Sequence, residues 1–277
     1  MGILSIQSHV VYGYVGNKAA TYPLQSMGYD VWPVNTVQFS SHTGYENWQG
    51  DVFSRDHIKK IIQAIENLGA INQCQAILSG YMGSKDTCLE VLETVQRFKA
   101  KNDKIIYLCD PVMGNSNCFV KPEVVDFFKT NLMKADIITP NQFEAEMLSG
   151  IAIKTTKDLK DIAKHFHDSG ILVVVITGVK LHENELFIFV SDGISQHLIP
   201  NKEYNFKIAP NGTGDLFSAV FLGTYLANKN ALESAKNAAY FMDIVVNNTF
   251  LAQTRELQVI STRYDYSPKN HPSSIID

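Results

Sequence analysis

The sequence has few cysteines and no block of like charge. Its 277 residues include four cysteines, which have neither the paired spacing of a zinc site nor the density of a disulfide scaffold: Cys74, Cys88, Cys109 and Cys118. We therefore expect reduced thiols. The formal net charge is −4, and no run of Lys or Arg supplies the clustered positive surface that binding to a nucleic-acid backbone requires. These absences argue against a disulfide-stabilised domain, a zinc module and a nucleic-acid-binding protein.

Long apolar runs are also missing. No run approaches the roughly 18 residues of a membrane span, and the N-terminus lacks a basic start followed by a long apolar stretch. We expect a cytoplasmic protein that makes no membrane contact. Two common phosphate-binding loops are absent as well: there is no Gly-x-x-x-x-Gly-Lys-Ser/Thr, and no Gly-x-Gly-x-x-Gly follows the first predicted strand. Any phosphate site must use a different turn.

Short apolar runs alternate with helical patterns along the whole chain. Strands are predicted over Gly2–Gln7, Asp30–Thr36, Ala76–Ser79, Lys104–Cys109, Asp136–Thr139 and Ile171–Thr177. Helices are predicted over Val15–Met27, Asp56–Leu68, Lys85–Ala100, a segment beginning near Pro122, Asn141–Leu148, Thr156–Asp168, Gly214–Ala227 and Ala231–Asn247. This alternation predicts an α/β fold with a mostly parallel, doubly wound sheet and helices on both faces.

A hairpin is predicted at one edge of that sheet, formed by Leu186–Val190 and Gly193–Ile199 around a Ser-Asp-Gly turn. The last thirty or so residues have no regular pattern and are expected to form a less regular tail. We find no repeat, no low-complexity tract and no linker, so residues 1–277 are interpreted as one domain.

A glycine-rich turn opens directly onto an apolar helix near the C-terminal end. Residues 210–215 read Pro-Asn-Gly-Thr-Gly-Asp and run into the apolar segment 216–221. Gly212 and Gly214 permit a tight turn, so that the free N–H groups of the helix start can converge on a phosphate, with Asp215 beside it as a proton acceptor. The alternative is that Thr213 and Asp215 merely cap a buried helix.

The position of Asp215 predicts a weak base. A carboxylate at a helix N-terminus is stabilised as an anion by the helix dipole, so we expect the pKa of Asp215 to be lowered. A weak base is adequate for phosphoryl transfer, because the attacking hydroxyl keeps its proton until late and charge neutralisation supplies most of the acceleration.

Polar groups follow the predicted strands, where open α/β sheets bind ligands. Those groups lie at Ser8-His9, Thr36 to Gly44, Ser79 to Tyr81, Asp110-Pro111, Thr139 to Asn141 and Thr177-Gly178. Each alone could be a cap or a turn. Asp110, Asn141 and Glu144 offer the oxygen ligands that Mg²⁺ on a nucleotide requires, and Asn141 and Glu144 share a helix face. The competing interpretation of residues 139–144 is a turn followed by a capped helix.

Several segments together resemble one family. The turn at 212–215 resembles the late signature of ribokinase-like kinases, and five further segments are similar to those of the pyridoxal kinases, which are vitamin B6 kinases: 7–17, 35–45, 79–81, 109–114 and 139–146. The resemblance runs from the first strand to about residue 250. It implies a ribokinase-like three-layer α/β/α fold.

The resemblance implies ATP-dependent phosphorylation of the 5′-hydroxyl of pyridoxal, and of pyridoxine and pyridoxamine, to give pyridoxal 5′-phosphate in B6 salvage. It places the pyridine ring of the substrate near Ser8, Val15, Thr43 and Tyr81. The hydroxyls of Ser8 and Thr43 would hydrogen-bond the polar edge of the ring, and Val15 and Tyr81 would cover its faces. Asp215 becomes the base, and Gly212, Thr213 and Gly214 form the anion hole.

The same resemblance assigns the nucleotide side. Metal ions and phosphates are held by Asp110, Thr139, Asn141 and Glu144, with Asp110, Thr139 and Glu144 as metal ligands. Thr177, Thr213 and the segment before Pro210 border the nucleotide. Family members use ATP, Mg²⁺ and often a monovalent cation such as K⁺ or Na⁺, and are commonly homodimers.

The sequence departs from the family pattern in the segment 115–120. Asn115 stands where some relatives have an Asp that could help to bind the metal, and this flap segment is short. Cys118 within it either meets the aldehyde of pyridoxal or is a partly buried spectator thiol. His9 and His42 flank the expected pocket, and either can be a hydrogen-bonded structural imidazole.

Two rival functions remain open. One is a hydroxymethylpyrimidine kinase of thiamine synthesis, although the position corresponding to the anion-hole Asp resembles Cys in that family. The other is a non-catalytic carrier of pyridoxal or its phosphate, in which Asp215, Asp110 and Glu144 would have no evident use. Vitamer preference, cation choice and the dimer surface are not fixed by these patterns.

Overall fold

The structure is a computed structural model that describes residues 2–183, 185–262 and 273–276. Within these ranges one sheet is formed by ten strands: β1 (Gly2–Val10), β2 (Asp30–Phe39), β3 (Gly50–Val52), β4 (Cys74–Ser79), β5 (Ile106–Cys109), β6 (Ile137–Ile138), β7 (Val173–Val179), β8 (Leu186–Ser191), β9 (Gln196–Asn201) and β10 (Ser274–Ile275). Their order across the sheet is β10-β9-β8-β7-β6-β5-β4-β1-β2-β3.

The centre of the sheet is parallel and its two margins are antiparallel. Strands β2, β1, β4, β5, β6 and β7 pair in parallel, whereas β3 pairs antiparallel to β2, and β8, β9 and β10 extend the other margin antiparallel. The predicted α/β class, the mostly parallel sheet and the β8–β9 hairpin are therefore confirmed.

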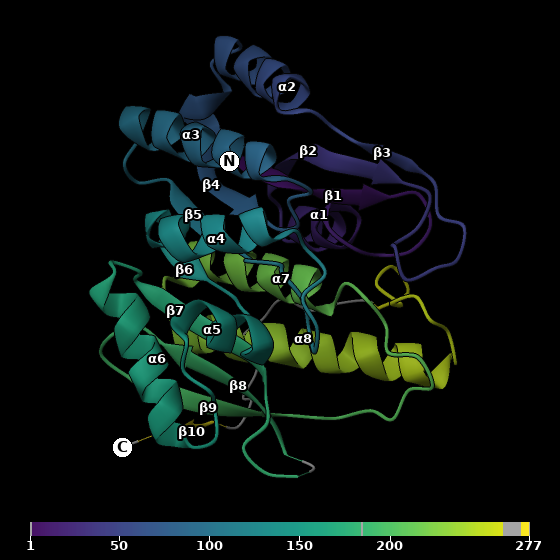
Figure 1. The fold of residues 1–277 in the computed structure, drawn as a ribbon, viewed down its shortest axis with the longest axis vertical. Coiled ribbons are helices and arrows are strands. Elements are labelled where there is room, and N and C mark those ends of the chain that lie inside the picture. Colours follow the sequence, from purple (N-terminus) through teal and green to yellow (C-terminus); the bar gives the residue numbers. More distant parts are fainter. Residues whose placement is uncertain (1, 184, 263–272, 277) are drawn as a thin grey trace.

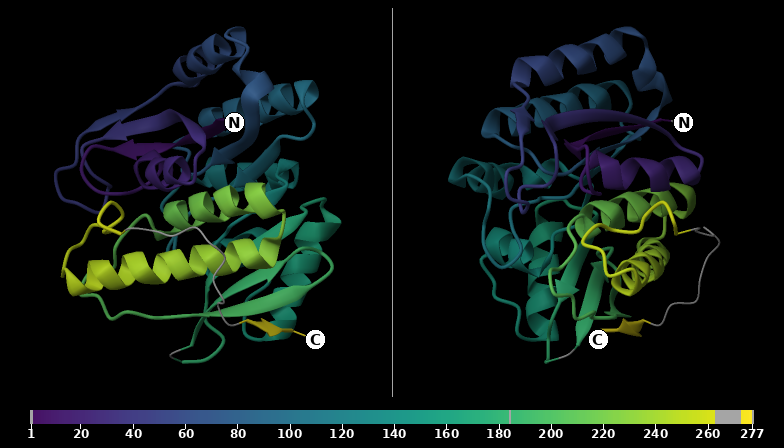
Figure 2. Two further views of the ribbon diagram at one scale, coloured as in Figure 1. Left: turned by 180° about the vertical axis from the view of Figure 1, so that it is seen from behind. Right: turned by 90° about the vertical axis from the view of Figure 1, so that its right-hand side faces the viewer.

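Helices cover both faces of the sheet. The α-helices of the described residues are α1 (Asn17–Ser26), α2 (Arg55–Asn67), α3 (Lys85–Lys101), α4 (Pro122–Asn131), α5 (Gln142–Ser149), α6 (Thr156–Asp168), α7 (Thr213–Asn228) and α8 (Ala231–Leu251). Figure 1 shows α2 to α6 on the near side of the sheet, and the reverse view in Figure 2 brings α1, α7 and α8 to the front. The result is the three-layer arrangement expected of a ribokinase-like fold.

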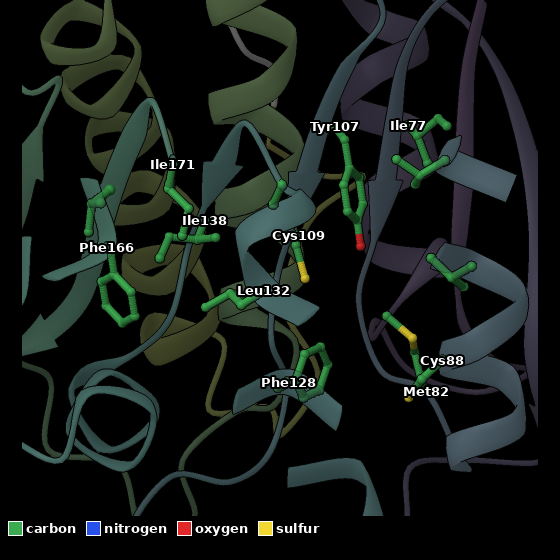
Figure 3. Packing of buried hydrophobic residues seen from close by; sticks show 14 of the residues in the cluster. Ile77, Met82, Cys88, Tyr107, Cys109, Phe128, Leu132, Ile138, Phe166 and Ile171 are labelled. Carbon is green, nitrogen blue, oxygen red and sulfur yellow. The ribbon is translucent and has the colours of Figure 1, made fainter. Parts of the chain in front are cut away.

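Each face of the sheet has its own apolar core. One core joins the sheet to α2–α6, and Figure 3 shows Tyr107 and Cys109 of β5 with Phe128 of α4 within it. The other joins the sheet to α1, α7 and α8 and includes Phe221 and Phe241, both almost completely buried. Removing this apolar area from water is the main favourable contribution to folding, and it makes the sheet a rigid support for its loops.

Local capping explains where several helices begin. Ser54, Ser84 and Asn230 each accept a hydrogen bond from the backbone N–H three residues on, which satisfies a free donor of the first turn. Thr155 and Asp158 form a reciprocal capping box at the start of α6. These side chains agree with the helix starts predicted from the sequence.

Two strands were missed and several boundaries moved. Strand β2 continues to Phe39, three residues past its predicted end, and β3 then pairs with that extension through Val37 and Val52. The three residues of β3 are all exposed, so they give no apolar alternation to detect. Strand β10 lies in the C-terminal segment predicted to be irregular, and residues 263–272 and 277 of that segment lie outside the described residues.

The cysteines are free thiols, as predicted. Cys74, Cys88 and Cys109 are buried, and burial raises the pKa of the Cys88 and Cys109 thiols to about 12. These thiols are therefore protonated and unreactive at neutral pH. Among the described residues, no helix combines the length and apolar character needed to cross a membrane.

Candidate active site

The carboxyl ends of the parallel strands meet the N-terminus of α7 at one edge of the sheet. Asp110 follows β5, Thr139 follows β6 and Thr177 lies near the end of β7, while Gly214 lies in the first turn of α7. A Cβ atom placed on Gly214 would be 3.7 Å from Oδ2 of Asp110. The glycine-rich turn and the strand-end acids that the sequence singled out are therefore neighbours.

Glycine is required at the start of α7. Gly212 is the N-cap with φ of 90°, a conformation that side chains disfavour, and a Cβ atom there would collide with the carbonyl oxygen of Tyr14. No side chain caps this helix, so the alternative in which Thr213 and Asp215 serve as caps is wrong. The first backbone N–H groups of α7 therefore remain available to an anion.

Asp215 faces the loop between β1 and α1. Its carboxylate accepts a hydrogen bond from the backbone of Gly16, which lowers the pKa of Asp215, but burial has the larger effect and raises that pKa above its ordinary value. The predicted lowering by the helix dipole is therefore wrong, because removal from water outweighs the dipole here. A raised pKa makes Asp215 a better proton acceptor than the sequence indicated.

Asp110 and Thr139 are joined by a serine that sequence analysis did not identify. Ser218 of α7 donates a hydrogen bond to Oδ2 of Asp110 at 3.3 Å and lies 2.8 Å from Oγ1 of Thr139. Because its only hydroxyl proton goes to Asp110, Ser218 accepts from Thr139. All three side chains are buried. The available signal was a lone hydroxyl in the apolar run that follows Asp215.

Glu144 binds backbone amides with both carboxylate oxygens. Oε1 accepts from the N–H groups of Met113 and Gly114 at 2.8 and 3.3 Å, and Oε2 accepts from Asn141 at 2.9 Å. In return the Asn141 side chain accepts from the Glu144 N–H at 3.0 Å. The capped-helix interpretation of residues 139–144 is therefore confirmed for the local structure. The Glu144 carboxylate also connects the loop after β5 to the start of α5.

Three acidic groups share this edge without a cationic partner. Burial and the charges of Glu144 and Asp215 raise the pKa of Asp110 well above its usual range, and burial raises that of Glu144 to about 7 against the opposing effect of its three amide donors. Of the ion pairs found in the described ranges, none involves these carboxylates. The same part of the chain contains no cluster of three or more His, Cys, Asp or Glu able to hold a metal ion.

The residues expected around the pyridine ring come from β1 and from three loops, which lie after β1, between β2 and β3, and after β4. Val15 and Tyr81 pack against one small apolar cluster formed by Val10, Val37 and Phe39. Ser8 is buried, and it contacts Gly16 so closely that a Cβ atom on Gly16 would collide with it. Since Gly16 also contacts Asp215, Ser8 lies near the base.

Thr43 lies in the exposed part of the loop between β2 and β3. Its neighbour His42 is buried and accepts a hydrogen bond at Nδ1 from the N–H of Gly44 at 3.1 Å. His42 also lies 3.3 Å from Nδ2 of Asn211, which precedes the glycine turn. The prediction of a hydrogen-bonded structural imidazole is confirmed for His42.

The residues expected to border the nucleotide adjoin the ends of β6 and β7. Asn141 forms a β-bridge with Thr177, whose N–H donates to the carbonyl of Pro140 at 2.9 Å. An open cavity of about 1000 Å³ is lined by residues 200–206, Ala209 and Asp243. The segment before Pro210 therefore borders a hollow large enough for a small ligand.

The short segment 115–119 is exposed throughout. Asn115 contributes no charge there, and Cys118 is exposed, so the prediction of a partly buried thiol is wrong. The bridge between Gly114 and Cys118 folds the segment into a tight turn that leaves this side chain in solvent.

Comparison with known proteins assigns the family. A family model described as phosphomethylpyrimidine kinase matches residues 49–258. Pyridoxal kinase PdxY of Histophilus somni (strain 2336) is 39% identical over 282 residues, covering 99% of this chain and 98% of the relative. Pyridoxal kinase PdxY of Vibrio vulnificus (strain CMCP6) is also 39% identical, over 279 residues that cover 98% of this chain and 95% of the relative.

Solved structures give the same result. Pyridoxal kinase from Leishmania donovani in complex with ADP and pyridoxine aligns with a TM-score of 0.86 at 30% identity, covering 94% of this chain and 93% of that one. Pyridoxal kinase from Entamoeba histolytica aligns with a TM-score of 0.90 at 25% identity over 99% of both chains. On this sequence and structural similarity, the chain belongs to the pyridoxal kinase family.

Proposed function

We propose that this protein transfers the γ-phosphoryl group of ATP to the 5′-hydroxyl of pyridoxal, and of pyridoxine and pyridoxamine, giving the 5′-phosphate and ADP. The relatives named above are pyridoxal kinases, and solved relatives hold ADP with pyridoxine or pyridoxamine. The observation that carries the proposal is the placement of Asp215 beside an uncapped helix N-terminus and next to the loop that bears Val15.

In this proposal the pyridine ring binds between Val15 and Tyr81. The hydroxyls of Ser8 and Thr43 hydrogen-bond its polar edge, which orients the 5′-hydroxyl toward Asp215. The common packing of Val15 and Tyr81 on one apolar cluster, and the contact of Ser8 with Gly16, support this arrangement. Orientation of this kind lowers the entropic cost of reaching the transition state.

The proton and the phosphoryl charge go to separate groups. The 5′-oxygen forms a bond to the γ-phosphorus as the bond from that phosphorus to the ADP oxygen breaks, and the hydroxyl proton passes to Asp215. The backbone amides of Gly212, Thr213 and Gly214 neutralise charge on the transferred group. The raised pKa of Asp215 suits the role of proton acceptor.

Three acids without a cationic partner among the described residues, Asp110, Glu144 and Asp215, fit a site for Mg²⁺ bound to the nucleotide. Mg²⁺ favours one or two carboxylates together with phosphate oxygens, and Asp110 offers one such carboxylate beside Thr139, both within hydrogen-bond distance of Ser218. Asp110 and Thr139 would hold the ion, and Glu144, whose oxygens are already occupied by amides, would act through its charge. When bound, Mg²⁺ supplies positive charge against the phosphates.

Asn141, Thr177 and Thr213 would border the phosphates, and the cavity before Pro210 would take the nucleoside. We further propose a cytoplasmic homodimer with one kinase domain per chain over residues 1–277, assisted by K⁺ or Na⁺. Family membership supports this part of the proposal.

The test measures ADP release at a fixed concentration of Mg-ATP. Each B6 vitamer, and hydroxymethylpyrimidine for comparison, is offered in turn as the acceptor. We expect turnover with pyridoxal and its loss in Asp215→Asn. Turnover with hydroxymethylpyrimidine alone would favour the rival kinase. Tight pyridoxal binding without ADP release would favour a carrier.

A further inference from the structure

The carboxylate of Glu256 joins two loops of the vitamin site. It accepts hydrogen bonds from the backbone N–H of Tyr14 at 3.1 Å and from the hydroxyl of Tyr45 at 2.6 Å. Nε2 of His42 lies 3.6 Å away. Tyr14 belongs to the loop after β1, and His42 and Tyr45 belong to the loop between β2 and β3.

The neighbouring backbone is shaped to admit this carboxylate. Gly13 has φ of 95°, and a Cβ atom on it would collide with the Glu256 side chain. Arg255 also contacts the loop between β2 and β3. Its guanidinium donates to the carbonyl of Gly44 at 2.7 Å and lies 3.9 Å from the centre of the Tyr45 ring. A cation over an aromatic face contributes its own attraction.

The residues held by Glu256 adjoin those of the proposed vitamin site. Thr43 lies between His42 and Gly44, both of which this cluster restrains, and Val15 follows Tyr14 directly. The Tyr14 carbonyl in turn contacts Gly212 of the catalytic turn. A single carboxylate thus connects the loop that bears Val15, proposed to cover one face of the pyridine ring, to the loop that bears Thr43, proposed to bind its polar edge.

The electrostatics agree with a charged Glu256 carboxylate that accepts hydrogen bonds. Burial alone would raise the pKa of Glu256, but the nearby His42 and the hydrogen bonds from Tyr45 and Tyr14 outweigh it and lower that pKa below its ordinary value. Burial and the Glu256 charge raise the pKa of Tyr45 to about 12, so its hydroxyl remains a donor. Since Nδ1 of His42 accepts from Gly44, the ring proton lies on Nε2, which faces Glu256.

We propose that Glu256 is a positioning residue for vitamin binding: through Tyr45, His42 and the Tyr14 amide it holds Thr43 and Val15 in the geometry that accepts the pyridine ring. This inference rests on the proposed function. It predicts that loss of the Glu256 carboxylate raises the KM for pyridoxal but not the KM for ATP. The residues proposed to bind the nucleotide lie elsewhere, at the ends of β6 and β7.

The experiment compares Glu256→Gln, Tyr45→Phe and the double variant with Glu90→Gln as a matched control. Glu90 is likewise buried and hydrogen-bonded, to Arg55 and Arg97, but lies between α2 and α3. We expect the KM for pyridoxal to rise about tenfold in Glu256→Gln and several-fold in Tyr45→Phe, as is usual for loss of a hydrogen bond to a charged group. The double variant should be no worse than Glu256→Gln, because Tyr45 acts through that carboxylate.

Hydrogen exchange gives a readout that does not depend on activity. The two Glu256-linked loops, residues 11–16 and 40–49, should exchange faster in Glu256→Gln and Tyr45→Phe than in the parent, and unchanged in Glu90→Gln. If Glu256→Gln does not fold, Tyr45→Phe, which keeps the ring contacts, decides the question.

The proposal would be overturned if the folded variants kept the parent's KM for pyridoxal and the parent's hydrogen-exchange rates in the two loops. An equal rise in the KM for ATP would also overturn it, because the effect would then be general. A parent that releases no ADP with any B6 vitamer would contradict the proposed function instead, and the exchange comparison would still decide whether Glu256 holds the two loops.

Discussion

The backbone of Gly212 lies against the carbonyl oxygen of Tyr14 so closely that a Cβ atom on Gly212 would overlap it. This contact joins the proposed catalytic turn to the loop after β1, from which Gly16 reaches the Asp215 carboxylate. Two segments far apart in the sequence therefore fix the position of the proposed base relative to the proposed vitamin site.

Gly212→Ala should impair catalysis by displacing the glycine turn from the loop after β1. Gly28→Ala is a matched control, because Gly28 has φ of 89° against 90° for Gly212 and no atom within 4 Å of its Cβ position. Both variants should lose about 1 kcal/mol of stability from the positive φ, and Gly212→Ala should lose more because its Cβ atom meets the Tyr14 carbonyl oxygen. Only Gly212→Ala should also lose turnover, by more than about tenfold. Steady-state kinetics and urea unfolding check this, and equal turnover in the two variants would contradict it.

Asp215→Asn should abolish most turnover while leaving the fold and the affinity for ATP intact. General-base contributions are typically on the order of 10² to 10⁴ in rate, and we expect kcat to fall within that span. Because burial raises the pKa of Asp215, kcat of the parent should decline on acidification at a pH above the ordinary Asp value of 3.8. Near-normal kcat in a stable Asp215→Asn protein would falsify the catalytic role.

The fold was predictable because its signals are local. Buried strands and amphipathic helices each repeat within a few residues, so their order along the chain indicated the parallel sheet. Strand β3 had no such signal, since all three of its residues are exposed and its partner is the far end of β2. The polar strand ends also indicated the edge at which the site lies.

The site was predictable where one segment carries the chemistry and not where distant segments meet. The glycine turn reads as an anion site from its own six residues. The pKa of Asp215 depends instead on burial against the β1 loop, which overrides the local helix dipole. Glu256 reaches Tyr14 across 242 positions, and no pattern near residue 256 indicates that contact.

Removal of the Ser8 or Thr43 hydroxyl should weaken vitamin binding more than chemistry. Ser8→Ala and Thr43→Ala should raise the KM for pyridoxal by the loss of roughly 1 to 2 kcal/mol of hydrogen bonding, with a smaller change in kcat. Thr130→Ala is a control, because the Thr130 hydroxyl bonds only to the backbone of α4 and to Asn131. An unchanged KM in both single variants would remove Ser8 and Thr43 from the pocket.

Glu144→Gln should show whether the charge of Glu144 acts on the metal nucleotide. The variant keeps the shape but removes the negative charge, so activity should fall and partly recover with excess Mg²⁺. It also replaces the acceptor for the Asn141 N–H by an amide group, which should lower stability. Glu146→Gln in the same helix, which removes one charge but keeps an oxygen that can accept from the Ile153 N–H, should keep the parental Mg²⁺ dependence. If Glu144→Gln also keeps it, Glu144 is a structural helix residue.

The stability contributed by Glu256 should depend on pH in a defined direction. Its pKa is lowered in the folded protein, so the contribution is fully present above the ordinary value of 4.5 and is lost as pH falls through the lower folded value. Measured in a His42→Gln background, the loss of unfolding free energy caused by Glu256→Gln should therefore be constant near neutrality and shrink below about pH 4.5. His42 and Tyr45 also face this carboxylate, and Tyr45, whose pKa is raised to about 12, stays neutral over that range. Urea unfolding from pH 7 to pH 3.5 measures the difference, with Glu256→Gln in His42→Gln as the background that removes the histidine. A difference that grows on acidification in both backgrounds would show that the Glu256 carboxylate is not held as an anion by its donors.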